Sequence, residues 1–338
     1  LIMNNKKILI CGAGGFIGGH LVTHLLQDKS NKIVCVDIKP KENWFQIYDQ
    51  NENYSLDLKD FNNCLKVTEN IDYILNMACN MGGMGFIENN KAECMLSVLI
   101  NTNLLRATLI NKVKKYFFSS SACVYNGSKQ QETFIPGLKE VDAYPAEPED
   151  GYGWEKLFSE RMCRHFKEDF DLDTRVVRYH NIYGPLGTYD GGREKAPAAL
   201  CRKIIKAKIN NEKKILVWGD GEQTRSFLFI DDCIKGTMKI FNSEYNDVFN
   251  IGSDEQVSIN QMISIIEDIA EYKVEKVYQP DKPKGVRGRS SNNDFVTKKT
   301  DWKPNFSLKE GLKITYDWIY SEMTRGVNSS KFTKNSKS

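Results

Sequence analysis

A run of glycines directly after the first apolar segment constrains the fold of this chain more than any other feature. Residues 7–11 form a short apolar run, glycines follow from Gly12 to Gly18, a helix-length stretch covers 16–27, and a second apolar run covers 32–37. This order predicts a β-α-β unit. Glycines there allow a tight turn, close approach of the backbone to a pyrophosphate and close packing of the helix. The segment predicts a dinucleotide-binding loop that includes Gly12, Gly15, Phe16, Ile17 and Gly18.

Strand-like and helix-like segments continue to alternate through the first 180 residues. Apolar runs lie at 73–76, 115–118 and 174–178, and helix-length segments separate them. This alternation is typical of a parallel sheet with helices on both faces. We therefore predict an α/β fold with a Rossmann-type doubly wound parallel sheet and a smaller C-terminal substrate-binding lobe.

The pattern changes after residue 180, and this change sets the expected domain boundaries. We assign residues 1–180 to the dinucleotide-binding domain and 181–325 mainly to the substrate-binding lobe, with some segments returning to the first domain. Ser258 and Gln261 form a capping-box pattern that predicts the start of a helix. Residues 326–338 contain few apolar side chains, so we expect a disordered tail.

Charge and cysteine content exclude several classes of function. The chain has 47 Lys and Arg against 44 Asp and Glu, and this balance is too weak to indicate nucleic-acid binding. Nine scattered cysteines without a Cys-x-x-Cys pair predict free thiols in the cytoplasm. No apolar run is long enough for a membrane span, and no spacing of ligands indicates a metal site. We expect a cytoplasmic protein that binds small molecules.

An acidic residue at the end of the second predicted strand indicates which dinucleotide is bound. Asp37 lies about 20 residues after the glycine loop, where a carboxylate accepts hydrogen bonds from the adenosine ribose and repels a 2′-phosphate. This position favours NAD over NADP. Asp57 lies where an adenine contact is expected, although the N-cap of the following helix is an equal alternative.

A tyrosine and a lysine four residues apart form a candidate acid/base pair. Tyr152 and Lys156 are separated by one helical turn, so they share a face of the expected helix. We expect the ammonium group to lower the pKa of the Tyr152 hydroxyl, which could then take a proton from a substrate hydroxyl. Ser121 follows the strand expected at 115–118 and would hydrogen-bond the same substrate oxygen.

The glycine loop, the acidic strand end and the Ser/Tyr/Lys set resemble the extended short-chain dehydrogenase/reductase family. Within it, several segments are similar to the GDP-mannose 3,5-epimerases. The similarity spans roughly residues 6–322, and its most specific segments are 80–86 (NMGGMGF) and 191–197 (GGREKAP). Further matching segments are 120–125, 145–148, 180–185, 218–221, 223–226 and 285–289.

The resemblance implies a reaction that is redox-neutral overall. NAD would oxidise the C4 hydroxyl of GDP-mannose through Tyr152, and the ketone would acidify the hydrogens on C3 and C5. Cys123 and Lys195 would exchange protons at these carbons, and C4 would then be reduced to give GDP-L-galactose and GDP-L-gulose. Because Cys123 lies two residues beyond Ser121, an extended segment would point both side chains to one side.

The resemblance also implies contacts with cofactor and substrate. It adds Met77 to the cofactor contacts. The cationic side chains Lys203, Arg225 and Arg289 would hold the diphosphate, and Arg287 is a weaker candidate. The full expected set for the substrate is Gly83, Ser121, Cys123, Asn181, Glu194, Lys195, Ala196, Lys203, Gln223, Arg225, Ser226 and Arg289.

Other functions remain open on the sequence alone. A nucleotide-sugar C4 epimerase, or another extended short-chain dehydrogenase, needs only the Ser, Tyr and Lys groups, whereas nothing would then require Cys123. A 4,6-dehydratase is disfavoured because Ala122 and Cys123 stand where it carries Asp and Glu. A non-catalytic NAD-binding protein could also have this fold. The family resemblance implies a homodimer, and we expect a long helix near 86–110 to form its interface.

Overall fold

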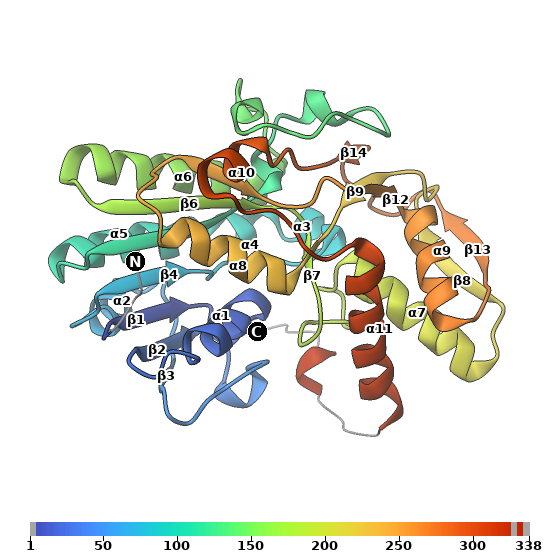
Figure 1. The fold of residues 1–338 in the computed structure, drawn as a ribbon, viewed down its shortest axis with the longest axis horizontal. Helices are drawn as coiled ribbons and strands as arrows, with labels where there is room; N and C mark the ends of the chain where they lie inside the picture. Colours follow the sequence, from blue (N-terminus) through green and yellow to red (C-terminus); the bar gives the residue numbers. More distant parts are fainter. Residues whose placement is uncertain (1–4, 326–329, 334–338) are drawn as a thin grey trace.

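Seven parallel strands form the central sheet of the molecule. The computed structural model describes residues 5–325 and 330–333. The strand order is β11-β6-β5-β4-β1-β2-β3 (Figure 1). The strands are β1 (Lys7–Cys11), β2 (Lys32–Asp37), β3 (Glu52–Ser55), β4 (Tyr73–Asn76), β5 (Lys115–Ser121), β6 (Asp173–Tyr179) and β11 (Val248–Ile251). The prediction of a Rossmann-type doubly wound sheet is confirmed.

Helices cover both faces of this sheet because its strands are apolar on both sides. Ile8 and Ile10 of β1 pack into one hydrophobic core, whereas Leu9 and Cys11 pack into the other. This alternation follows from the two-residue repeat of a strand. The first face carries α1 (Phe16–Leu25) and α8 (Ile230–Phe241), and the second carries α2 (Phe61–Val67), α5 (Val98–Ile110) and α6 (Asp150–Phe170).

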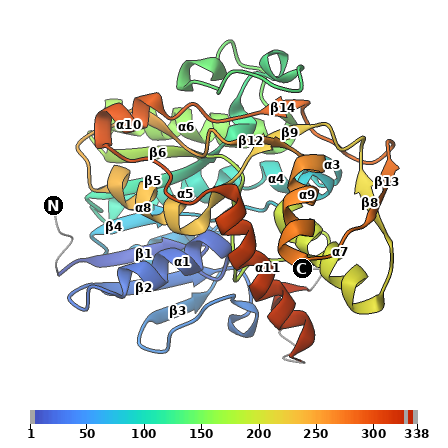
Figure 2. The same ribbon diagram turned by 45° about the vertical axis from the view of Figure 1, so that its right-hand side comes forward.

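A smaller group of elements lies beside the carboxyl ends of the strands (Figures 1 and 2). The parallel strands β8 (Lys214–Trp218) and β13 (Glu275–Gln279) pair there. They lie near α7 (Ala196–Asn210), α9 (Ile259–Ala270) and α11 (Leu308–Thr324). One hydrophobic core contains buried residues of both the large sheet and this group, so the two parts are tightly joined.

Sequence signals for the smaller group are partly confirmed. Ser258 and Gln261 form the expected capping box at the start of α9. A three-stranded sheet of order β12-β9-β14 joins segments far apart in the sequence. Its strands are β9 (Thr224–Ser226), β12 (Gln256–Ser258) and β14 (Gly288–Arg289). The remaining short elements are β7 (Ile182–Tyr183), β10 (Leu228–Phe229) and α10 (Asp294–Thr300).

Three features differ from the sequence-based expectation. Strand β3 was not expected, because its residues are polar and lie at the edge of the sheet. The apolar run at 248–251, which we assigned to the smaller lobe, returns to the large sheet and pairs with β6. The helix expected near 86–110 is three helices, which are α3 (Met84–Asn89), α4 (Lys91–Met95) and α5. Asn90 interrupts the chain between the first two with a non-helical conformation.

The described part of the C-terminal segment also differs from the expected disordered tail. Ser330–Phe332 form a short 3-10 turn, and Phe332 is buried against Phe45 and Trp318. One aromatic side chain thus gives this segment the apolar contact that its composition lacks. Residues 326–329 and 334–338 lie outside the described residues.

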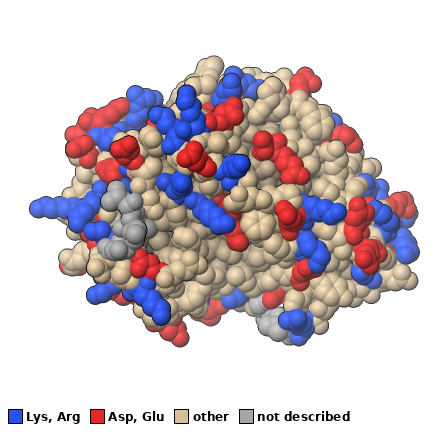
Figure 3. Space-filling model, in the orientation of Figure 1, with Lys and Arg blue, Asp and Glu red and all other residues tan. Residues whose placement is uncertain are grey.

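Positive and negative side chains are mixed over the face shown in Figure 3. No large field of one sign covers that face, in agreement with the small net charge. In the part of the chain that the structure describes, no helix is long and apolar enough to cross a membrane.

Candidate active site

The glycine loop after β1 has the geometry that its sequence predicts. Gly12 has a φ of 77°, and a Cβ atom there would lie 2.9 Å from the backbone of Met77 and Ala78. A Cβ atom on Gly18 would lie 2.1 Å from the carbonyl oxygen of Gly12. Helix α1 begins after Gly15, which has no side chain to cap it. The loop therefore presents free helix amides to an anion, as a dinucleotide pyrophosphate requires.

Asp37 lies at the end of β2 beside this loop. Its carboxylate accepts a hydrogen bond of 3.0 Å from the backbone of Lys39, and burial raises its pKa although the Lys39 charge opposes this. The Lys39 ammonium group donates to the carbonyl of Gly14 at 2.6 Å. Lys39 was not singled out from the sequence, and it ties the acidic strand end to the glycine loop.

Met77 and Asp57 are the two remaining residues predicted to contact the cofactor, and they lie in different surroundings. Met77 follows β4, and its backbone N–H donates to Cys11 at 2.9 Å, which holds it beside the glycine loop. The Asp57 side chain is 42% exposed and accepts from the backbone of Lys59. Asp60, and not Asp57, caps α2, so the N-cap alternative for Asp57 is wrong.

Tyr152, Lys156 and Ser121 come together at the carboxyl edge of the sheet. Tyr152 and Lys156 lie on one side of α6 and are both buried. The Lys156 ammonium group donates to the carbonyl of Ser119 at 2.8 Å and lies 5.7 Å from the centre of the Tyr152 ring. Ser121 is the last residue of β5, and its side chain lies close enough to the Tyr152 hydroxyl to lower the pKa of that group.

The pKa of Tyr152 differs from the expected direction. Burial raises it well above its ordinary value, and the nearby Cys79 and Cys123 add to the rise. The expectation of a lowered pKa considered only Lys156 and ignored desolvation of the phenolate. The pKa of Lys156 is raised, because Cys79 and Glu155 outweigh the effect of burial, so this lysine stays charged.

Cys123 lies next to Ser121 but not in an extended segment. Ala122–Val124 form a 3-10 turn, and the backbone N–H of Cys123 donates to the Ser121 hydroxyl at 3.2 Å. The expected alternation of a strand is therefore wrong here, although the two residues remain adjacent. The Cys123 thiol is buried and accepts from Arg289 at 3.6 Å.

Lys195 lies at the start of α7, with Ala196 as the first helical residue. Burial lowers the pKa of its ammonium group, and the nearby Cys123, Cys79 and Cys233 partly oppose this effect. Lys195 is therefore close enough to Cys123 for each to act on the charge of the other. The preceding Glu194 instead accepts hydrogen bonds from Gly192 and Arg202 and shapes the loop.

Close packing of two segments of the chain requires a glycine at Gly83. A Cβ atom there would lie 2.5 Å from the carbonyl oxygen of Glu194, and its N–H donates to Arg193. The glycine thus lets the segment 191–197 approach the end of β4. Its role in the structure is to place Lys195.

Two predicted cations are paired neighbours in the three-stranded sheet. Arg289 of β14 is the register partner of Arg225 of β9. Arg289 binds Glu149 at 2.9 Å, whereas Arg225 donates to the carbonyls of Thr224 and Lys284. Among the described residues, Arg225 has no carboxylate in ion-pair contact. Burial and the Arg289 charge lower its pKa to about 10, so an anionic ligand would be stabilised there.

Other residues that were predicted to bind the substrate lie around Arg225 and Arg289. Asn181 donates to the carbonyl of Ser226 at 3.0 Å, and the Ser226 hydroxyl accepts from Ser291. The Gln223 side chain donates to Trp218, and its buried oxygen has no hydrogen-bond partner in the described structure. A substrate donor could satisfy that oxygen.

Two predicted cations are more exposed and already bound. Lys203 donates to the carbonyl of Leu216 at 2.7 Å. Arg287 binds both oxygens of Asp220 at 2.9 Å and is 34% exposed, so it is less available for a phosphate.

Besides Lys39, two residues of the site were not found from the sequence. Cys79 lies close enough to Tyr152, Lys156 and Lys195 to affect the pKa of each of them. No sequence motif marked this cysteine. Glu149 stands immediately before α6 and three residues before Tyr152, and this helical spacing could have indicated that both face the site.

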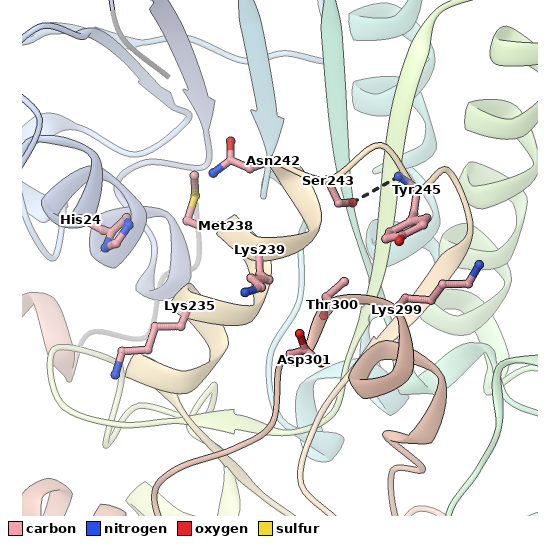
Figure 4. Close-up of a pocket in the computed structure, with 10 residues that line it drawn as sticks. All are labelled: His24, Lys235, Met238, Lys239, Asn242, Ser243, Tyr245, Lys299, Thr300 and Asp301. Carbon is pink, nitrogen blue, oxygen red and sulfur yellow. Dashed lines mark hydrogen bonds between the residues drawn. The ribbon is translucent and has the colours of Figure 1, made fainter. Parts of the chain in front are cut away.

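A cavity of about 630 Å³ lies elsewhere (Figure 4). It is at the C-terminal ends of α8 and α10, and none of the predicted site residues lines it. Lys239 and Lys299 lie in the last turns of these helices, where a positive charge is favourable, which explains these two lysines without a ligand. The lining residues are His24, Lys235, Met238, Lys239, Asn242, Ser243, Tyr245, Lys299, Thr300 and Asp301.

Across the described ranges, no group of three or more His, Cys, Asp or Glu side chains could hold a metal ion.

Comparisons with known proteins agree with this geometry. The sequence profile of the NAD dependent epimerase/dehydratase family matches residues 8–252. The chain is 45% identical to GDP-mannose 3,5-epimerase of Arabidopsis thaliana over 322 residues, which cover 95% of this chain and 84% of that protein. It is 46% identical to GDP-mannose 3,5-epimerase 1 of Oryza sativa subsp. indica over 327 residues, with coverages of 95% and 85%.

A solved structure confirms the fold. The UDP-glucose 4-epimerase of Thermotoga maritima, solved with UDP-glucose, superposes with a TM-score of 0.84 at 24% identity. The match covers 94% of this chain and 99% of that one. At this identity the similarity establishes the fold and does not favour C4 epimerisation.

Two alanine substitutions in the glycine loop test its role. We expect Gly18→Ala to weaken NADH binding by at least about tenfold, because the added Cβ atom would meet the Gly12 carbonyl oxygen at 2.1 Å. Gly15→Ala should cause a smaller loss, because its Cβ atom would lie 3.2 Å from the same oxygen. Fluorescence titration with NADH measures both, and equal affinities would contradict the proposed loop geometry.

Proposed function

The chain belongs to the NAD dependent epimerase/dehydratase family, and from this membership we propose that it converts GDP-mannose to GDP-L-galactose and GDP-L-gulose as a 3,5-epimerase. The identity of 45–46% with GDP-mannose 3,5-epimerases along 95% of the chain supports this activity. The observation that carries the proposal is the cluster in which Cys123 lies beside Ser121 and close to Tyr152, with Lys195 close to Cys123. A C4 epimerase needs no such proton-exchanging pair.

NAD is the cofactor of this reaction. The glycine loop offers the backbone shape and helix amides for its pyrophosphate, and Asp37 lies where the adenosine ribose would bind. When bound, NAD supplies the reversible oxidation of the sugar C4 hydroxyl to a ketone. The loop residues Gly12, Gly15 and Gly18, together with Phe16, Ile17 and Met77, would hold it.

Tyr152 exchanges the proton of the C4 hydroxyl. Its hydroxyl group lies near the Ser121 side chain, so both can contact one substrate oxygen. Lys156 stays charged beneath the ring, and its charge favours the phenolate when Tyr152 gives up its proton. Because burial raises the Tyr152 pKa, this help from Lys156 is needed for proton transfer near neutral pH.

Cys123 and Lys195 exchange the protons at C3 and C5. Inversion of a carbon needs one group that removes a proton from one face and another that returns a proton to the other face. A ketone at C4 makes the neighbouring hydrogens acidic enough for an amine or a thiol to act on them. Cys123 is buried and Lys195 is half-buried, which limits the access of water that would otherwise compete for these protons.

The diphosphate of the substrate binds near Arg225 and Arg289. Two buried guanidinium groups face one buried carboxylate, Glu149, so the cluster keeps a net positive charge. That charge attracts an anion in a site of low dielectric constant. Lys203, Gln223, Asn181 and Ser226 would contact the remaining nucleotide and sugar groups.

A homodimer in the cytoplasm is the proposed state of the protein. Five large apolar side chains are exposed on three neighbouring helices, and a second copy would cover them. They are Met95 of α4, Leu96 and Leu99 around the start of α5, and Trp154 and Phe158 of α6. All nine cysteines are free thiols, as a reducing compartment favours.

Two substitutions test the roles assigned to Tyr152 and Cys123. Tyr152→Phe should lower turnover of GDP-mannose by at least about 100-fold, because the phenolic proton acceptor is lost. Cys123→Ser should also suppress epimer formation while leaving NADH binding unchanged. Chromatography of the products over time measures both. Near-normal turnover in either variant would contradict the assigned role.

One charge on the exposed apolar surface tests the dimer. Phe158→Glu should convert the dimer to a monomer, because it buries a charge in the proposed interface. Phe170→Glu is the matched control: it lies on the same helix with a similar exposure of 56%, against 51% for Phe158, and should leave the mass unchanged. Sedimentation velocity measures the mass, and a Phe158→Glu dimer would rule out this interface.

A further inference from the structure

The guanidinium group of Arg289 is bound on three sides inside the protein. It donates to the Gln130 side-chain oxygen at 2.7 Å, to the Cys123 sulfur at 3.6 Å and to the Glu149 carboxylate at 2.9 Å. The Arg289 side chain is 4% exposed and that of Glu149 is 14% exposed. An ion pair so buried persists only with good geometry, because each charge alone would be strongly destabilised.

The backbone reinforces the contact between Glu149 and Cys123. The N–H of Glu149 donates to the carbonyl of Cys123 at 2.8 Å. A Cβ atom on Gly153 would lie 2.4 Å from that same carbonyl oxygen, so the start of α6 packs directly on the Cys123 turn. The carboxylate is thus held beside the thiol and the guanidinium group together.

Several charged and titratable groups face Cys123 from the surrounding elements. Glu149 and Tyr152 come from the start of α6, and Arg289 comes from β14. Lys195 comes from the start of α7, and Arg225 comes from β9. Of these five, Glu149 is the carboxylate, and it is bound to Arg289, which contacts the sulfur.

We propose that Glu149 is a positioning residue of the epimerisation, which offsets the charge of Arg289 beside the sulfur so that Cys123 enters the cycle as a protonated thiol. Cys123 is then the proton donor of the first inversion, and Lys195 is the proton acceptor. This inference rests on the proposed function, because it assigns directions to the two groups of that reaction.

Each proton in this sequence is accounted for. Neutral Lys195 takes the proton from the carbon next to the C4 ketone, and the electron pair of the broken C–H bond forms an enolate. The enolate carbon then takes the proton of the Cys123 S–H bond on its other face, and the ketone is restored. Lys195 is left as an ammonium group and Cys123 as a thiolate beside Arg289. A second inversion in the opposite direction returns both groups to their starting states.

The electrostatics of the two groups support this direction. Burial raises the pKa of the Cys123 thiol to about 11, and the Glu149 charge contributes to the rise while Arg289 opposes it. Burial lowers the pKa of Lys195. Burial also acts on Glu149, but Arg289 lowers the Glu149 pKa overall and keeps this group ionised. A thiol that holds its proton and an amine that loses its proton more readily are suited to these roles.

Glu149→Gln tests the inference, because it removes the charge and keeps the size of the side chain. Without the carboxylate, the Arg289 charge should lower the pKa of the Cys123 thiol by at least about one unit, which increases its thiolate fraction at neutral pH about tenfold. The readout is the rate at which iodoacetamide alkylates Cys123 in the substrate-free protein between pH 6 and 11, followed by mass spectrometry of the Cys123 peptide. An unchanged midpoint would overturn the proposal.

Two controls separate charge from structure. Glu147→Gln removes an exposed carboxylate two residues away and should leave the alkylation midpoint unchanged. Glu149→Asp keeps the charge and should return the midpoint toward that of the unmodified protein. If Glu149→Gln does not fold, the unmodified protein decides: its Cys123 midpoint must lie well above the ordinary cysteine value of about 8.5, and a lower midpoint would refute the inference.

The pH dependence of turnover supplies a second readout. Activity should rise as Lys195 loses its proton and fall as Cys123 loses its proton, and Glu149→Gln should move only the falling limb to lower pH. A uniform loss of activity without that shift would show a structural role alone. Alkylation needs no sugar substrate, so failure of the proposed function and failure of this inference give different results.

Discussion

The buried contact between the Lys156 ammonium group and the Ser119 carbonyl fixes the geometry on which the site depends. It joins α6 to β5 with a charge-assisted hydrogen bond of 2.8 Å in the interior. Because Ser121 ends β5 and Tyr152 lies one turn before Lys156, this contact sets the distance between the two groups that share a substrate oxygen. A lysine so buried would be unfavourable without a polar partner.

A second buried network supports the same two elements. Arg178 of β6 forms two hydrogen bonds with Glu160 of α6, at 2.9 and 2.7 Å, and Glu160 also accepts from Ser120. Two strands and a helix are thereby held at fixed relative positions. Against this rigid edge, segments from the smaller group of elements bring Lys195, Arg225 and Arg289 over the ends of the strands.

The fold was largely predictable because its signals are local. Apolar runs of strand length and the glycine turn after β1 mark the positions of most strands of the large sheet, and the Ser258 capping box marked α9 correctly. The polar edge strand β3 carries no such signal, and the return of β11 to the large sheet depends on pairing across about 70 residues of chain.

The sequence predicted most residues of the candidate site, but it did not predict their pKa shifts or their local backbone geometry. Tyr152, Lys156 and Ser121 follow from spacing, and the similarity to known epimerases added Cys123 and Lys195. The sequence could not show that desolvation raises the Tyr152 pKa or that Ala122–Val124 form a turn, because burial and local geometry arise from tertiary contacts. The ion pair of Glu149 was missed for the same reason, since its partner Arg289 is 140 residues away.

Proton NMR of GDP-mannose incubated with the purified protein in D₂O tests the central claim most directly. If the chain is a 3,5-epimerase, deuterium will replace hydrogen at C3 and C5, signals of the epimers will grow, and no net NADH will accumulate. If NAD and GDP-mannose both bind and neither carbon acquires deuterium, the proposed epimerisation is wrong.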